Sequence, residues 1–337
     1  MNAPLLDVVG LKQTFETRSG KAYAVDGVSF SIGKGETLGL VGESGCGKST
    51  VARSIAGLLP VTSGSVRLSG VEISQLSRAE LKPYRRQIQM VFQNPSSALN
   101  PRLTVGRLIE EPRIVHSLGN RAERKEAVFK FMEMVGLRRD LADRLPHELS
   151  GGQRQRVCIA RALILSPSLI ICDEAVSALD VSVQAQVVNL LRDLQEELGV
   201  SYLFISHGLT VTRHMSHRTA VMYLGRIVEE GATAAIFDRP RHPYTRALLA
   251  AAPSLDPGAR DKQFAMIEGE LPSPLAPPSG CHFHTRCPLA AARCRTEAPT
   301  LRRVGGQNVA CHFADQEPDN NFGRSLLPVE AAKQISM

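Results

Sequence analysis

The sequence lacks any run of about 18 or more apolar residues, the length that a membrane-spanning helix needs. Its longest apolar stretches, at residues 163–172 and 247–252, are short and interrupted. Residues 1–9 also lack the basic segment and following apolar stretch of a secretory signal. We therefore expect the 337-residue protein to stay in the cytoplasm.

A concentrated basic stripe is also missing, although the net charge is +7 and the pI is about 9.2. Lysine and arginine are scattered, and the densest patches lie at residues 85–86 and 121–125. A solvated basic surface is therefore favoured over a nucleic-acid-binding face. The 43% of hydrophobic and 22% of charged residues are typical of a globular protein, and the sequence has no internal repeat.

The seven cysteines fall into two groups. Three occur singly in the first part of the chain. The other four lie within residues 281–311, and they are Cys281, Cys287, Cys294 and Cys311. Because a reducing cytoplasm disfavours disulfides, this second group is more typical of a metal site.

Short apolar runs alternate with helical patterns along the first part of the chain. This alternation predicts an α/β fold with a mostly parallel sheet. Residues of about 96–165 interrupt it with a mainly helical insert, in which residues 122–136 have apolar side chains at helical spacing. The expected strands are residues 28–32, 37–41, 169–172 and 202–205, and the other expected helices are residues 48–59 and 183–198.

A glycine-rich segment joins the expected strand 37–41 to the helix that follows, and it fits the pattern G-x-x-x-x-G-K-[ST]. Glycines let backbone N–H groups turn inward around an anion, and the helix N-terminus adds its positive end. Lys48 is expected to reach the β- and γ-phosphates of ATP, and the Ser49 hydroxyl to coordinate Mg²⁺. The predicted nucleotide-binding residues here are Gly42, Ser44, Gly45, Cys46, Gly47, Lys48, Ser49 and Thr50.

Two carboxylates follow the apolar strand 169–172. Asp173 is expected to hold Mg²⁺, and Glu174 to act as the general base that polarises the attacking water. By itself an Asp-Glu pair is a weak signal, since strands often end in solvated charges. Together with a phosphate loop it predicts a site of ATP hydrolysis.

A third motif, Leu-Ser-Gly-Gly-Gln at residues 149–153, precedes an arginine-rich helix. Its hydroxyl and backbone donors form a second anion site, although a plain helix cap would give the same pattern. The order of phosphate loop, Val-Phe-Gln at 91–93, this motif, the strand with its acidic pair, Ser-Ala-Leu-Asp at 177–180 and Ser-His at 206–207 resembles the ATP-binding-cassette (ABC) ATPases. The resemblance covers residues 6 to about 230.

That resemblance implies roles for further residues. Gln93 would sense the γ-phosphate and Mg²⁺ and contact a transmembrane partner, and His207 would contact the γ-phosphate. Phe15 would stack on adenine, with Tyr23 as the alternative. Asp180 would lie at the seam of a dimer. The signature residues would close on ATP held by a second subunit, and they are Ser150, Gly151, Gly152 and Gln153.

Two positions depart from the family pattern. Gly208 follows His207 where aspartate is usual, and Ala175 follows Glu174 where proline is common. Neither change removes a group that contacts nucleotide in the family. Gly208 is expected to loosen the loop that holds His207.

The resemblance also implies an architecture. An ATPase domain at residues 1–235 would combine the mainly parallel sheet with an antiparallel β subdomain and the helical subdomain. A separate C-terminal extension would occupy residues 236–337. Its segment 242–249 looks like the tail of oligopeptide and dipeptide importer ATPases.

As such a motor subunit, the protein would power peptide uptake, with nickel or oligosaccharides as alternative cargo. The implied partners are two transmembrane permease subunits, a second ATPase subunit and an extracytoplasmic substrate-binding protein, with no nucleic acid. The implied location is the cytoplasmic face of the inner membrane. A soluble ABC protein of translation or DNA repair usually has two cassettes or a long coiled-coil insert, and the sequence shows neither. A module that no longer hydrolyses ATP is disfavoured by the intact Glu174.

The cysteine spacing, C-x₅-C-x₆-C-x₁₆-C, fits neither the short zinc pattern nor the common ferredoxin run. Zinc, an iron–sulfur cluster and four free thiols in a small core therefore all stay open from the residues. The resemblance to peptide-importer ATPases implies a [4Fe–4S] cluster on these four cysteines.

Overall fold

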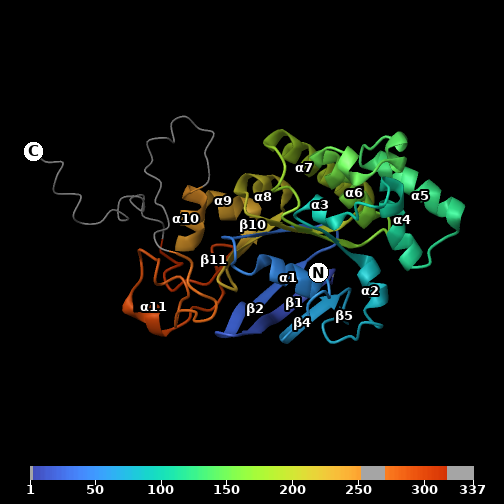
Figure 1. Ribbon diagram of the computed structural model, residues 1–337. Coiled ribbons are helices and arrows are strands. Elements are labelled where there is room, and N and C mark those ends of the chain that lie inside the picture. Colours follow the sequence, from blue (N-terminus) through green and yellow to red (C-terminus); the bar gives the residue numbers. More distant parts are fainter. Residues whose placement is uncertain (1–2, 252–269, 317–337) are drawn as a thin grey trace, which may run out of the picture.

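A computed structural model describes residues 3–251 and 270–316. Within these two ranges, no helix combines the length and apolar character needed to cross a membrane. The chain forms two sheets, a helical lobe and a C-terminal extension (Figure 1).

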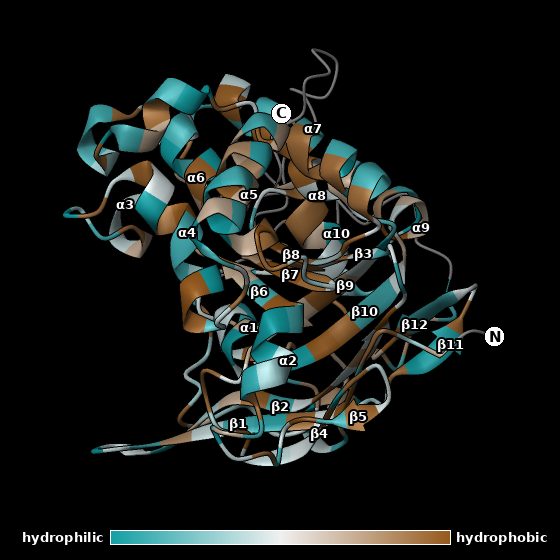
Figure 2. Cartoon of the chain, turned by 90° about the vertical axis from the view of Figure 1, so that its right-hand side faces the viewer, coloured by the Kyte–Doolittle hydropathy of each residue, from teal (hydrophilic) through white to brown (hydrophobic). Residues whose placement is uncertain are grey.

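The larger sheet has the strand order β11-β12-β10-β9-β3-β8-β7-β6. Every residue of β3, β7 and β8 is buried, as expected for parallel strands covered on both faces. Figure 2 shows apolar residues concentrated on these central strands and hydrophilic residues on the outer faces of the helices. The parallel strands are β3 (Thr37–Val41), β6 (Ile88–Val91), β7 (Leu169–Asp173), β8 (Ser201–Ser206) and β9 (Arg218–Tyr223). The predicted strands 37–41, 169–172 and 202–205 are therefore confirmed.

The smaller sheet is antiparallel, with the order β2-β1-β4-β5. Its strands are β1 (Leu6–Thr17), β2 (Gly20–Ile32), β4 (Ser63–Leu68) and β5 (Val71–Glu72). The helix α1 (Lys48–Ile55) shares one apolar core with both sheets, in which Val51 packs with Ile32 and Leu40. The predicted helix 48–59 ends early because Gly57 takes a left-handed conformation (φ 64°).

The helical lobe lies at the end of the molecule opposite α11 (Figure 1). It contains α3 (Pro95–Ala98), α4 (Val105–Val115), α5 (Arg121–Met134), α6 (Gly151–Leu163) and the 3₁₀ turns Arg139–Asp143 and Pro146–Glu148. Asn120 and Glu123 form a capping box that begins α5. Buried Leu108, Phe131 and Val157 join the helices in one core, which agrees with the expected helical insert.

Helices also connect and flank the strands elsewhere. These are α2 (Lys82–Gln87), α7 (Val181–Leu198) and α8 (Leu209–Met215). The predicted helix 183–198 begins two residues earlier than expected, at Val181, and ends as expected at Leu198, because Gly199 is left-handed (φ 66°).

The C-terminal extension packs against the ATPase domain, and the predicted division of the chain into two domains stays a prediction. Its elements are α9 (Thr233–Asp238), α10 (Pro243–Ala250), α11 (Ala292–Thr296), β11 (Arg302–Val304) and β12 (Gln307–Val309). The last strand β12 pairs antiparallel with β10 (Arg226–Ala232), so the extension continues the larger sheet. Residues 252–269 and 317–337 of the predicted extension lie outside the described residues. The boundary at residue 236 stays a prediction.

Candidate functional site

The predicted phosphate loop lies between β3 and α1 and is tightly enclosed. A Cβ on Gly42 would lie 2.1 Å from the Met222 carbonyl oxygen, and one on Gly47 would lie 2.1 Å from that of Ala24. Both residues also have positive φ angles, 154° and 106°. Only glycine therefore fits either position. Cys46 is buried in the loop, and burial raises the pKa of its thiol, so it is a small packing residue rather than a reactive one.

The Lys48 side chain folds back along the loop and is only 4% exposed. Its Nζ donates hydrogen bonds to the carbonyl oxygens of Gly42 and Glu43, each at 2.8 Å. The ammonium is therefore held inside the ring of loop backbone, where the predicted phosphates would meet it.

The two residues predicted to hold Mg²⁺ beside the phosphates lie next to each other. The Ser49 hydroxyl donates a 2.8 Å hydrogen bond to Oδ1 of Asp173, which is 5% exposed. Burial raises the pKa of the Asp173 carboxyl, while the Ser49 bond acts in the opposite direction. A buried carboxylate and a hydroxyl are oxygen ligands that suit Mg²⁺.

The Glu174 carboxylate contacts Gln93 and lies close to His207, the other residues predicted to act in hydrolysis. Gln93 Nε2 donates to its Oε2 at 2.8 Å, and His207 Nδ1 lies 3.6 Å from the same oxygen. Glu174 has a left-handed backbone (φ 50°), and its N–H donates to the Ile205 carbonyl at 3.0 Å. The strained backbone aims the carboxylate toward Gln93 and His207. Gln93 contacts Glu174 rather than the Ser49–Asp173 pair to which the predicted Mg²⁺ role would assign it.

The backbone of Gly208, in the loop after β8, makes hydrogen bonds through both its N–H and its carbonyl. Gly208 donates its N–H to the Ser206 hydroxyl at 2.9 Å and accepts from the Thr212 N–H at 3.1 Å. Its φ of −81° is open to any residue. These bonds hold the Gly208 backbone, and the expected effect of Gly208 on the loop that holds His207 stays a prediction.

A cavity of about 350 Å³ opens over the loop. Its lining includes residues 44–50, Gln93 and Glu174 on one side and residues 22–24, Leu224 and Gly225 on the other. Tyr23 is among the lining residues and Phe15 is not. Phe15 lies one strand away, paired with Ala22 of the lining, and is 37% exposed. Its predicted adenine contact stays a prediction.

The C-terminal extension contributes a residue to this cavity that the sequence did not reveal. Pro274 lines the cavity, and its carbonyl accepts the Tyr23 N–H at 2.9 Å. Proline clusters marked the region as irregular, but nothing in their spacing indicated a contact with β2.

The signature residues do not line the cavity. Ser150 is exposed and begins α6, where its Oγ accepts the Gln153 N–H at 3.2 Å and Gln153 Oε1 accepts the Ser150 N–H at 2.9 Å. Gly151 and Gly152 form the first turn of that helix. Asp180 begins α7 and is also exposed. One chain thus brings the loop and the acidic pair together, and leaves the signature turned to the surface.

The four cysteines of the extension gather in one place. Burial, together with the charges of the other three cysteines, raises the pKa of Cys287 to about 12. In the described ranges, however, no group of three or more His, Cys, Asp or Glu residues is arranged to hold a single metal ion. A single-zinc site therefore has no ready-made geometry here. The three cysteines whose charges act on Cys287 are Cys281, Cys294 and Cys311.

Comparisons with known proteins agree with the geometry. Residues 25–177 match the ABC transporter family, and residues 228–294 match the oligopeptide/dipeptide transporter C-terminal region. The probable peptide ABC transporter ATP-binding protein y4tS of Sinorhizobium fredii is 56% identical over 88% of this chain and 84% of its own length. The oligopeptide transport ATP-binding protein OppF of Escherichia coli is 51% identical over 92% of this chain and 96% of its own length.

A solved dimeric ATP-binding cassette, in a post-hydrolysis state with ADP and Pi, aligns with a TM-score of 0.63 and 32% identity. The alignment covers 68% of this chain and 98% of that structure. The expected fold class, a P-loop ATPase core with a mainly parallel sheet, an antiparallel β subdomain and a helical lobe, is confirmed. The chain therefore belongs to the ABC transporter family, as one of its ATPases with an oligopeptide/dipeptide-type C-terminal region.

Proposed function

We propose that this protein is the ATP-binding and ATP-hydrolysing subunit of an ABC importer that powers peptide uptake across the cytoplasmic membrane. The contact of Ser49 with Asp173, beside Glu174 over the phosphate loop, carries the proposal. The names of the two relatives, both peptide-transport ATP-binding proteins, support the cargo class. Nickel or oligosaccharide import would use the same motor and is the alternative.

In this proposal the chain's own groups divide the work. Lys48 would leave the two loop carbonyls and pair with the β- and γ-phosphates. Ser49 and Asp173 would hold Mg²⁺, which would supply positive charge beside the phosphates. Glu174 Oε2 accepts a proton from the attacking water. Gln93 and His207 both lie close to Glu174 Oε2, and they orient this carboxylate oxygen toward the γ-phosphate.

The surface position of the signature supports a two-subunit site. Ser150 and Gly152 would close on ATP bound to a second cassette, identical or homologous, with Asp180 at the seam. The described state of the related cassette, a dimer with ADP and Pi, is consistent with this arrangement. Two transmembrane permease subunits would carry the cargo, an extracytoplasmic binding protein would deliver it, and this chain would sit peripherally on the inner face of the membrane.

The substitution Glu174→Gln tests the assigned base. We expect ATP hydrolysis to fall by about 10²-fold or more, while ATP affinity is retained, because a neutral amide cannot accept the proton. Glu133→Gln, an exposed change on α5, is the matched control and should hydrolyse ATP as the wild type does. Unchanged hydrolysis in Glu174→Gln would refute the assigned role. Co-purification with two multi-span membrane proteins, followed by transport assays on peptides, nickel and oligosaccharides, tests the cargo.

The proposal includes a [4Fe–4S] cluster on Cys281, Cys287, Cys294 and Cys311. The charges of these four cysteines interact, and together they offer four thiolates. This number suits such a cluster, since each of its irons takes one thiolate. The bound cluster would also supply positive iron that favours the ionised thiols. Iron and acid-labile sulfide are measured on anaerobically purified protein, with Cys158→Ser as the control for a buried cysteine elsewhere. Protein that contains neither element would exclude the cluster.

A further inference from the structure

The C-terminal extension fixes the second residue of the phosphate loop from two directions. The Glu43 backbone N–H donates a 2.9 Å hydrogen bond to the Tyr244 hydroxyl oxygen. The Glu43 carboxylate forms a bidentate ion pair with Arg286, at 2.9 and 3.1 Å. Both partners lie in the extension, 201 and 243 residues further along the chain.

Glu43 also touches the residue that is expected to bind phosphate. Its carbonyl oxygen is one of the two carbonyl oxygens that accept hydrogen bonds from Lys48 Nζ. A shift of the Glu43 peptide group would therefore move one of the carbonyl oxygens that hold the Lys48 ammonium. The position of this residue links the extension to the charge that the nucleotide would meet.

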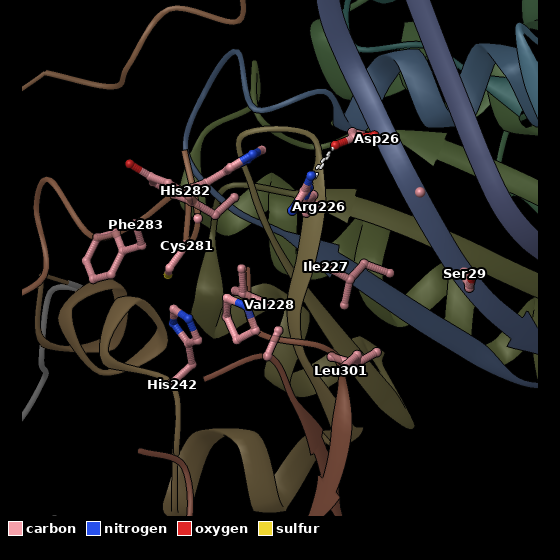
Figure 3. A pocket seen from close by; sticks show the side chains of 15 residues that line it. Asp26, Ser29, Arg226, Ile227, Val228, His242, Cys281, His282, Phe283 and Leu301 are labelled. Atoms are coloured by element: carbon pink, nitrogen blue, oxygen red, sulfur yellow. Dashed lines mark hydrogen bonds and ion pairs between the residues drawn. The ribbon is translucent and has the colours of Figure 1, made fainter. Parts of the chain in front are cut away.

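Tyr244 is held rigidly enough to act as such an anchor. It is fully buried, and its ring packs 4.7 Å from that of Tyr223 and 5.4 Å from that of Phe283. His242 caps α10 by accepting the Tyr244 N–H through Nδ1 at 3.1 Å. Figure 3 shows His242, Phe283 and Cys281 grouped at one side of a neighbouring cavity of about 280 Å³, across from Arg226 and Asp26.

Arg286 comes from the cysteine-rich segment itself. It directly precedes Cys287, and its side chain is only 7% exposed. Its guanidinium lies over the Tyr223 ring, 5.9 Å from the centroid. A partly buried, bidentate arginine–carboxylate pair of this kind fixes direction as well as distance.

We propose that Tyr244 and Arg286 are positioning residues of the ATP site: through Glu43 they hold the phosphate loop in the shape that binds nucleotide. This inference rests on the proposed ATPase function and assigns part of that site to the extension. It makes the cysteine-rich segment, through Arg286, a mechanical support of the loop. Neither residue touches the nucleotide in this proposal.

A double-mutant cycle on the purified full-length chain tests the Arg286 contact. Arg286→Gln is expected to weaken ATP binding and raise KM by about three- to ten-fold, with kcat changed less than about two-fold, because the acidic pair is untouched. In a Glu43→Gln background the same change should have little further effect, since its route to the loop is already cut. Arg293→Gln breaks an exposed ion pair of the same extension and is the matched control.

Tyr244→Phe tests the second contact with minimal disturbance of packing, because only the hydroxyl is removed. It should raise the ATP Kd by about three- to ten-fold, because a buried loop N–H loses its acceptor. Tyr202→Phe is the control, since the buried Tyr202 hydroxyl has no hydrogen-bond partner among the described residues. The melting temperature is followed for every variant.

The outcomes separate the two proposals. A wild-type chain that binds no ATP overturns the proposed function before any variant is compared. If the wild type binds ATP, then unchanged affinity in both Arg286→Gln and Tyr244→Phe overturns the positioning role. An equal loss from Arg286→Gln with and without Glu43→Gln also overturns it, because the effect would then not pass through Glu43.

Discussion

The hydroxyl of Ser49 lies 2.8 Å from the carboxylate of Asp173, although 124 residues separate them in the chain. The relationship follows from the sheet: Ser49 is at the start of α1, just after β3, and Asp173 ends β7, with β8 between the two strands. Because parallel strands bring their carboxyl ends to one edge, the loop and the acid meet there. The carboxylate of the buried Asp173 therefore lies beside the phosphate loop, where the predicted Mg²⁺ would be held.

Asp173→Asn is expected to abolish Mg²⁺-dependent ATP hydrolysis and yet to stabilise the nucleotide-free protein at neutral pH. Burial raises the pKa of the Asp173 carboxyl above its ordinary value of 3.8, so ionisation costs free energy in the folded state that asparagine avoids. The pKa of Asp173 is higher in the folded chain than in the unfolded chain. Protonated Asp173 therefore adds to stability below the unfolded-state pKa, and this contribution is lost as the pH rises through the folded-state pKa.

Thermal unfolding in EDTA from about pH 4 to 8 measures this effect. The gain in melting temperature of Asp173→Asn over the wild type should grow with pH, while Mg²⁺-ATP should stabilise only the wild type. Asp140→Asn, at a carboxylate with 57% side-chain exposure, serves as the control. A gain that shrinks as the pH rises would contradict the assigned burial cost.

Ser150 caps α6 and is also predicted to contact the partner's ATP, and substitution can separate these two roles. Ser150→Ala removes the N-cap of α6 and should lower stability by about 1 kcal/mol. Ser150→Asp keeps a good capping oxygen but places a negative charge where the partner's γ-phosphate is expected. We therefore expect Ser150→Asp to melt near the wild-type temperature and to lose most ATPase activity. Asn120→Asp, the equivalent change at the capped start of α5, should leave activity intact. Full activity in Ser150→Asp would exclude a phosphate contact there.

The adenine contact is decided by comparing two aromatic residues of neighbouring strands. Phe15 shares a strand face with Ala22, and Tyr23 is the next residue of β2. Ala22 and Tyr23 both line the cavity. We expect Phe15→Ala to weaken ATP binding about five-fold, as for loss of one aromatic stacking contact, and Tyr23→Ala to weaken it less. Equilibrium binding of ATP and of inorganic triphosphate distinguishes a base contact from a phosphate contact. A larger loss in Tyr23→Ala would transfer the role to Tyr23.

The sequence predicted best those features that depend on residues close together in the chain. The strand Thr37–Val41 agrees with its predicted bounds because glycines flank an apolar run, and the family motifs located Ser49, Asp173 and Glu174. The end of α1 was misjudged because the apolar pattern continues past Gly57, whose backbone conformation ends the helix. The ion pair of Glu43 with Arg286 has no sequence signal, since tertiary packing alone joins residues 243 positions apart.

Protonation of His242 is expected to uncouple the extension from the sheet as the pH falls. Burial, with a contribution from the charge of Arg246, lowers the pKa of His242 from its ordinary 6.5 to about 3. The unfolded chain therefore binds a proton that the folded chain does not, so stability is full above about pH 6.5 and falls progressively toward pH 3. Glu229, whose carboxylate accepts the backbone N–H of His242, acts in the other direction, because burial raises the pKa of its carboxyl.

His242→Asn isolates the contribution of the imidazole, because asparagine also caps helices. Urea unfolding between about pH 4 and 7 should show a smaller loss of unfolding free energy with falling pH in this variant than in the wild type. His147→Asn in the helical lobe is the matched control and should keep the wild-type slope. An unchanged slope in His242→Asn would show that the pH dependence arises from other groups, because the difference in bound protons between the unfolded and folded chains would then be the same with or without this imidazole.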